Sequence, residues 1–133
     1  MHGFILGFLL ASQVFIIQCK SQPDWITREP DVWVEKGIIY SRGSAKLSTQ
    51  TLTLVTAETR ARSNITRAVA RGEISGFLPI PSDIENRSTF NYNGIKGELG
   101  RTVIVENFIA KDGTGYVLIS CIGAELDARL DEE

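Results

Sequence analysis

The sequence has 133 residues, with 14 Lys and Arg against 16 Asp and Glu, and a formal net charge of −2. A net charge so close to zero gives no reason to expect electrostatic binding to nucleic acid or to a membrane surface. The chain holds two cysteines and one histidine, and of these only Cys121 lies beyond residue 19, which leaves too few ligands for a zinc site in the rest of the chain. We therefore expect no metal, no cofactor and no nucleic-acid partner.

The first eighteen residues have the layout of an export signal. Residues 3–17 are almost wholly apolar, and a polar stretch with the first lysine follows. This pattern is typical of the hydrophobic part of a signal peptide. Fifteen helical residues cover about 22 Å, less than a ~30 Å hydrocarbon core, so a membrane span is the weaker interpretation. Residues 1–18 contain no Lys or Arg, which leaves a start further upstream open.

Cys19 ends this apolar run, in the sequence FIIQCKS. A lipoprotein signal places aliphatic residues before a cysteine that becomes the lipidated first residue. Ile16, Ile17 and Cys19 fit, whereas Gln18 stands where Gly, Ala or Ser is usual. We predict lipidation at Cys19. The alternatives are a signal cleaved without lipidation, an uncleaved anchor, a buried helix of a cytosolic protein, and, without lipid, a disulfide between Cys19 and Cys121.

The 115 residues from Cys19 onward suit one domain with a modest core. Residues 20–32 combine two prolines with alternating charges and predict a tether, with Trp25 and Trp33 at the edge of the core. The β-branched and aromatic run that follows predicts a strand at about 36–43.

The clearest predicted element is a helix over residues 48–71. Its apolar residues recur at steps of three and four, which places them on one face. They are Leu54, Ala57, Ala61, Ile65, Ala68 and Val69. Ser48 or Thr49 can cap the start of this helix, and Gly72 can end it.

Three alanines on this face allow another element to approach the helix closely. Ala57, Ala61 and Ala68 are therefore the candidate packing interface, either in the core or between two copies of the chain. Glu58 and Arg62 lie four residues apart and predict a surface ion pair.

Arg60, Asn64, Arg67 and Arg71 follow one another at steps of four, three and four, which predicts a row on the helix face opposite the alanines. Arg60, Arg67 and Arg71 are the candidate site for an anion or an acidic partner. The plain alternative is a solvated face with its cations near the helix C-terminus.

Residues 73–100 predict a loop, because Pro79 and Pro81 exclude a helix interior and a central strand there. We expect an edge strand near 88–95. The glycines expected to be flexible turn residues are Gly94, Gly97 and Gly100.

Two β-rich runs, 101–110 and 115–123, predict a hairpin with a tight turn at Asp112 and Gly113. Cys121 on the second strand is expected to be a small core residue. Residues 125–133 are strongly acidic and predict a frayed or disordered tail.

Catalytic groups are scarce. His2 lies in the segment expected to be removed, so no histidine base remains. Asp83 and Glu85 could in principle share a metal, but two acids in a polar loop are usually solvated. We predict that the protein is not an enzyme.

Several motifs together resemble a known family. They are PDW after Cys19, YSRGSA in the first strand, AETRARSNITRAVARG in the helix and DGTGYVLI in the hairpin. Over residues 23–122 the chain resembles the bacterial twenty-kilodalton lipoprotein (Lpp-twenty-like) family. The resemblance implies an envelope lipoprotein with an α+β domain, in which one long helix packs on a small antiparallel sheet of three to four strands. It also implies frequent self-association and no catalytic residues.

Four segments are expected: a signal peptide (1–18), the lipidated cysteine and tether (19–32), the α+β domain (33–124) and the acidic tail (125–133). The expected function is a structural or assembly role of a lipid-anchored cell-envelope protein, linked to the outer membrane or to flagellar structures. Its expected partners are the membrane, through the lipid, and a second copy or another envelope protein. The alternative is a soluble or anchored periplasmic ligand-binding module, with a small apolar pocket or the arginines as its site.

Overall fold

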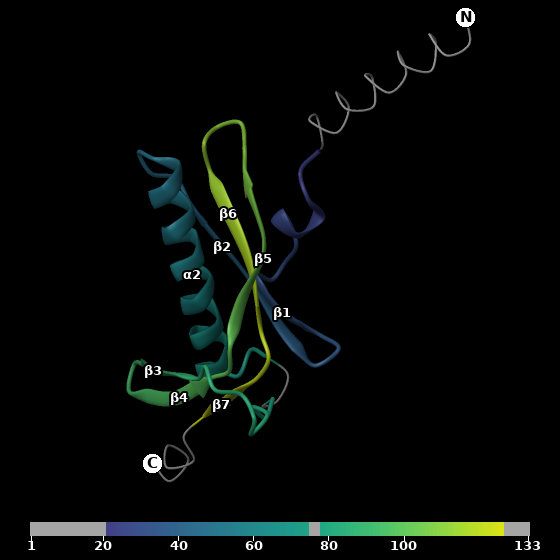
Figure 1. The fold of residues 1–133 in the computed structure, drawn as a ribbon, viewed down its shortest axis with the longest axis vertical. Helices are drawn as coiled ribbons and strands as arrows, with labels where there is room; N and C mark the ends of the chain where they lie inside the picture. The colour runs from purple at the N-terminus through teal and green to yellow at the C-terminus, as the bar shows by residue number, and fades with distance from the viewer. Residues whose placement is uncertain (1–20, 75–77, 127–133) are drawn as a thin grey trace, which may run out of the picture.

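The computed structural model describes residues 21–74 and 78–126 (Figure 1). One long helix packs on a four-stranded antiparallel sheet, and a separate three-stranded sheet closes one end of the domain. The predicted α+β class, with one helix on a small antiparallel sheet, is confirmed. The second sheet was not predicted.

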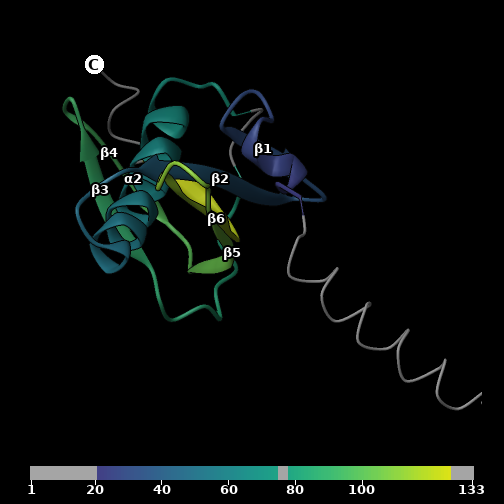
Figure 2. The same ribbon diagram turned by 90° about the horizontal axis from the view of Figure 1, so that it is seen from above.

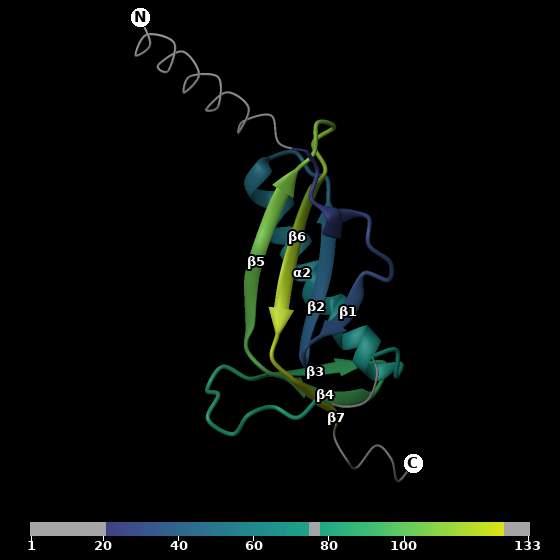
Figure 3. The same ribbon diagram turned by 90° about the vertical axis from the view of Figure 1, so that its right-hand side faces the viewer.

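The four-stranded sheet has the order β1-β2-β6-β5 (Figure 3). Its strands are β1 (Val32–Glu35), β2 (Ile38–Ala45), β5 (Thr102–Ile109) and β6 (Gly115–Cys121). The central pair joins distant parts of the sequence, because Ile39 lies opposite Cys121 and Ala45 opposite Gly115.

The strand predicted at 36–43 is β2, which begins two residues later. Lys36 and Gly37 have φ angles of 53° and 78° and form the two-residue turn that joins β1 to β2. Two positive φ angles are the geometry whose twist suits a tight hairpin. The hairpin partner β1 was not predicted, and it contains Trp33, which was expected only at the edge of the core.

The helix α2 (Gln50–Ala70) agrees with the predicted range of 48–71 to within two residues. The side chain of Thr49 accepts a hydrogen bond from a backbone amide of the first turn. At the other end Gly72 has a φ of 70°, and the amide of Glu73 donates to the Ala68 carbonyl over 2.9 Å. Both ends therefore satisfy backbone groups that a helix leaves unpaired.

The buried face of α2 lies against β2 and β6. Its buried residues are Thr53, Ala57, Ala61, Ile65 and Ala68. The three alanines are 0–1% exposed within one chain. This burial assigns them to the core and not to a contact between two copies of the chain. Gly43 of β2 allows the close approach, because a Cβ atom there would lie 2.5 Å from the amide nitrogen of Ala61.

The second sheet has the order β3-β4-β7, with β3 (Ser88–Tyr92), β4 (Ile95–Leu99) and β7 (Ala124–Leu126). The single edge strand predicted at 88–95 is wrong in extent, because Asn93 and Gly94 have positive φ angles and turn the chain back into β4. Gly94 is a turn residue, as expected. Gly97 instead lies inside β4, where a Cβ atom would lie 2.5 Å from the Phe90 ring.

The hairpin of β5 and β6 is confirmed, with a turn in which Gly113 has a φ of 94°. The Asp112 carboxylate accepts a 2.9 Å hydrogen bond from the Thr114 amide, and this hydrogen bond is the main reason that the pKa of Asp112 is lowered. The predicted acidic tail, 125–133, begins too early, because β7 extends through Leu126. Residues 127–133 lie outside the described part of the chain.

The stretch predicted as a tether packs on the sheet from Pro23 onward. A 3₁₀ helix, η1 (Asp24–Ile26), lies on the side of the sheet away from α2 (Figure 2), and Ile26 is only 6% exposed. The guanidinium of Arg42 donates hydrogen bonds to the carbonyl oxygens of Trp25 and Arg28. The predicted boundary at residue 32 is therefore wrong, because the preceding segment belongs to the folded domain.

Candidate functional site

The arginine row lies beside the helix–sheet interface and not opposite it. At about 100° per residue, Arg60 is one step around the helix from the buried Ala61, so the predicted placement is wrong. Arg60 donates a 2.9 Å hydrogen bond to the Ser44 carbonyl, and the Asn64 side chain donates over 2.9 Å to the Arg42 carbonyl. The first half of the row thus pairs with the backbone of β2.

The other two arginines have partners of their own. Arg67 donates over 3.0 Å to the side-chain oxygen of Asn64 and lies 3.6 Å from the Asp31 carboxylate. Arg71 donates over 3.2 Å to the hydroxyl of Tyr92. The three guanidinium groups therefore engage three different parts of the fold and do not converge on a common anion site. The predicted pair of Glu58 and Arg62 is present.

An aromatic cleft of about 510 Å³ lies between η1 and the outer face of the sheet. The Trp33 ring stacks on Tyr40 at 5.9 Å, and the guanidinium of Arg28 lies 4.4 Å from the centre of the Trp33 ring. Arg28 also pairs with Glu35 at 3.4 Å, and Glu35 accepts a hydrogen bond from the indole N–H of Trp33. A cation from this chain thus already occupies the aromatic face.

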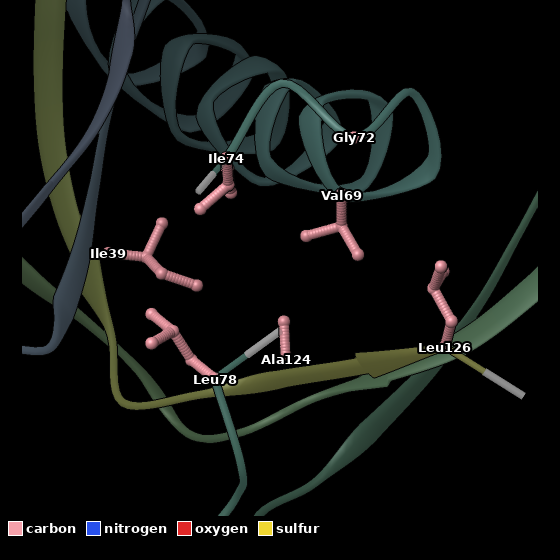
Figure 4. Close-up of a pocket in the computed structure, with 7 residues that line it drawn as sticks. All are labelled: Ile39, Val69, Gly72, Ile74, Leu78, Ala124 and Leu126. Carbon is pink, nitrogen blue, oxygen red and sulfur yellow. The ribbon is translucent and has the colours of Figure 1, made fainter. Parts of the chain in front are cut away.

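A smaller, apolar pocket of about 260 Å³ lies near the C-terminal end of α2. Figure 4 shows its side chains around a common space, contributed by β2, α2, β7 and the segment after α2. The lining residues are Ile39, Val69, Gly72, Ile74, Leu78, Ala124 and Leu126. None of the seven has a polar side chain, so the pocket suits a short alkyl group and supplies no group for acid–base chemistry.

Cys121 is fully buried, and its Sγ atom lies 3.3 Å from the Gly123 carbonyl oxygen. Burial raises the pKa of the Cys121 thiol, which disfavours the nucleophilic thiolate. Asp83 and Glu85 are exposed in a loop. Among residues 21–74 and 78–126, no three His, Cys, Asp or Glu side chains are grouped to hold a metal. Cys19 lies outside the described residues.

An exposed apolar edge was not identified from the sequence. Val103, Ile104 and Val105 are 48%, 47% and 50% exposed. They belong to β5, which in the described part of the chain pairs only with β6. The register shifts between Ile104 and Glu106, which makes Val105 the extra residue of a β-bulge. Three successive β-branched residues without polar alternation were the available signal, but the same pattern is typical of a fully buried strand.

Comparison with known proteins gives no match to a family model, a curated protein or a solved structure. The resemblance to the twenty-kilodalton lipoprotein family therefore stays a hypothesis. Within the two described ranges, no helix is long and apolar enough to cross a membrane.

Proposed function

We propose that the protein is a non-catalytic, lipid-anchored component of the bacterial cell envelope that acts by assembly with a protein partner. The observation that carries the assembly role is the edge strand β5, with three consecutive half-exposed β-branched residues at Val103 to Val105. An unpaired strand edge offers a row of backbone donors and acceptors, and apolar side chains on it favour pairing with another chain.

The anchor is proposed from the sequence, as a diacylglycerol thioether and an amide-linked acyl chain at Cys19. Two or more acyl chains suffice for stable membrane attachment, whereas one is marginal. The packed segment begins at Pro23, and four residue steps of extended chain reach at most about 14 Å. The proposed lipid would therefore hold the folded domain directly at the membrane surface.

The family resemblance supports the same setting. Its motifs imply an envelope lipoprotein with one long helix on an antiparallel sheet, and the α+β class agrees with that expectation. We propose the outer membrane as the location, with the domain facing the periplasm or the cell surface, and outer-membrane or flagellar structures as the assemblies it serves.

The anchor is tested by the intact mass of the protein from a bacterial membrane fraction, compared with a Cys19→Ala variant. We expect a mature chain that begins at Cys19 and carries the added mass of diacylglycerol and an acyl chain. The Cys19→Ala variant should lack this mass and leave the membrane fraction after a high-salt wash. A chain without lipid mass, cut elsewhere or uncut, would contradict the anchor.

A second candidate function is that of a ligand-binding module, which the apolar pocket favours. The pocket is slightly smaller than the usual range of ligand sites, so its ligand would be a short alkyl chain. Titration with fatty acids of increasing length tests this function. We expect Ala124→Leu, which fills the pocket, to abolish saturable binding, and Leu52→Ala on the exposed helix face to leave it unchanged. Equal binding by both variants would exclude the pocket as the site.

A further inference from the structure

We propose that the β5 edge pairs in antiparallel fashion with the β5 edge of a second copy of this chain. The two four-stranded sheets then form one continuous sheet of eight strands, with both α2 helices on the same face. This inference rests on the assembly part of the proposed function and is independent of the lipid anchor.

The edge has backbone available for pairing over most of its length. β5 spans eight residues, Thr102–Ile109, and within the described ranges its only partner is β6. Proteins usually protect such an edge with charges or a cover, because an exposed apolar edge promotes aggregation. Val103, Ile104 and Val105 are half-exposed and apolar, so this part of the edge carries no protecting charge.

The faces of β5 follow from its register with β6. Thr102 and Ile104 lie opposite Cys121 and Ile119, which belong to the core beneath α2. Val103 and Glu106 lie opposite Ser120 and Leu118, on the other face of the sheet. The bulge at Val105 is what places Val103 and Glu106 on the same face although they are three residues apart.

Charge along this edge identifies a second copy as the occupant. Arg101 is exposed immediately before β5 and, by the same alternation, lies on the face of Val103 and Glu106. A two-fold axis at Val103 places Val103 opposite its own copy and Thr102 opposite Ile104. When the bulged residue is skipped, Arg101 then lies opposite Glu106 of the second copy. The symmetry repeats this opposite-charge pair, and such cross-strand pairs are stabilising.

On the face of the sheet that carries α2, the two charged groups of Arg62 and Glu58 beside β5 are already paired with each other. Arg62 donates over 3.1 Å to the Thr102 hydroxyl, and Glu58 pairs with the same guanidinium. These two groups neutralise each other beside β5. An isologous contact of this kind also closes after two copies, because each edge is used once.

The test is disulfide crosslinking of the purified full chain under a mild oxidant, so that the result does not depend on the compartment in which the chain is made. Val103→Cys places two thiols face to face at the two-fold axis, within the Cα separation that a disulfide requires. Val55→Cys is the matched control, because Val55 is similarly exposed, at 55%, but lies on α2. Both variants are made in a Cys19→Ala background, so that Cys19 cannot form the crosslink, and Cys121 is buried.

We expect a dimer band on a non-reducing gel that is at least tenfold stronger for Val103→Cys than for Val55→Cys. Adding Glu106→Arg should reduce the band, because two arginines then face each other. The further change Arg101→Glu should restore it, since it restores opposite charges across the axis. This rescue also controls for the hydrogen bond that Glu106 accepts from Trp25, which the double exchange does not repair.

Equal bands for Val103→Cys and Val55→Cys, or no rescue by the charge exchange, would overturn the pairing. If Val103→Cys does not accumulate, a chain with Arg101→Cys and Glu106→Cys tests the same register through a different pair of thiols. A photo-crosslinker at position 103 that captures a different protein would also overturn the homodimer. The intact mass of the protein with Cys19 unchanged tests the lipid anchor separately, so the anchor and the dimer can each be refuted alone.

Discussion

Gly43 of β2 lies directly beneath Ala57 of α2, so closely that a Cβ atom on Gly43 would collide with the Ala57 carbonyl oxygen. The neighbouring contact is polar: the buried hydroxyl of Ser41 donates a 2.7 Å hydrogen bond to the Ala61 carbonyl. At Gly43, helix and sheet thus meet through backbone atoms, which cannot rotate away as a side chain can.

Gly43→Ala should destabilise the domain by about 3 kcal/mol, the upper end of typical overpacking costs. The added methyl group meets backbone atoms of Ala57 and Ala61, so the helix has to move away from the sheet. Urea unfolding measures the effect. Ser44→Ala, the next residue on the exposed face, should change stability by less than about 0.5 kcal/mol. A mild effect at Gly43 would mean that α2 can shift without cost.

Arg42→Gln should release the N-terminal segment from the sheet. The Arg42 side chain is 13% exposed and donates to the carbonyls of Trp25 and Arg28. Hydrogen bonds from a charged group contribute about 1.5–3 kcal/mol each, so trypsin cleavage after Arg28 should accelerate at least tenfold. Arg60→Gln, which removes one exposed hydrogen bond to a carbonyl, is the control. Cleavage at the same rate in both variants would disprove this anchoring role.

Cys121 should make stability fall at alkaline pH. Burial raises the pKa of its thiol in the folded state, so the unfolded chain releases the proton first. The contribution to stability is therefore complete below the ordinary thiol pKa of about 8.5 and is lost as pH rises above it. Unfolding of the unchanged chain and of Cys121→Ala at pH 7 and pH 10 measures the difference. Equal pH dependence in both would refute this assignment.

Arg67→Glu should weaken the fold by about 0.5–1 kcal/mol, because it places a carboxylate beside Asp31 in a partly exposed pair. The exchange Asp31→Arg with Arg67→Glu should recover most of this loss. The anion-binding alternative gives a different result: binding of phosphate that weakens with salt and is lost in Arg67→Glu. Calorimetric titration with phosphate, beside thermal unfolding, separates the two roles.

Local signals explain why α2 was predicted well. Its apolar spacing, the Thr49 cap and the glycine after Arg71 all lie within or beside the helix itself. Thr53 was missed among the buried residues because its hydroxyl is paired with the Leu47 backbone, a contact that periodicity cannot reveal.

The second sheet could not be predicted, because it depends on pairing between separate parts of the sequence. β7 is three residues long, lies in an acidic stretch and becomes a strand by pairing with β4. The apolar pocket likewise combines side chains from separate parts of the sequence, such as Ile39 and Leu126. Exposure of Val103 depends on β5 being an edge, which is a property of strand order and not of local sequence.

The pairing of β2 with β6 sets the order of events when the chain is made. Ile39 can pair with Cys121 only after all the residues between them have been synthesised, so the central sheet cannot close earlier. Folds dominated by such distant pairings form slowly. Until β6 has been synthesised, the central sheet of the nascent chain stays open, and an unfolded chain is the form that a secretion channel for unfolded polypeptide requires.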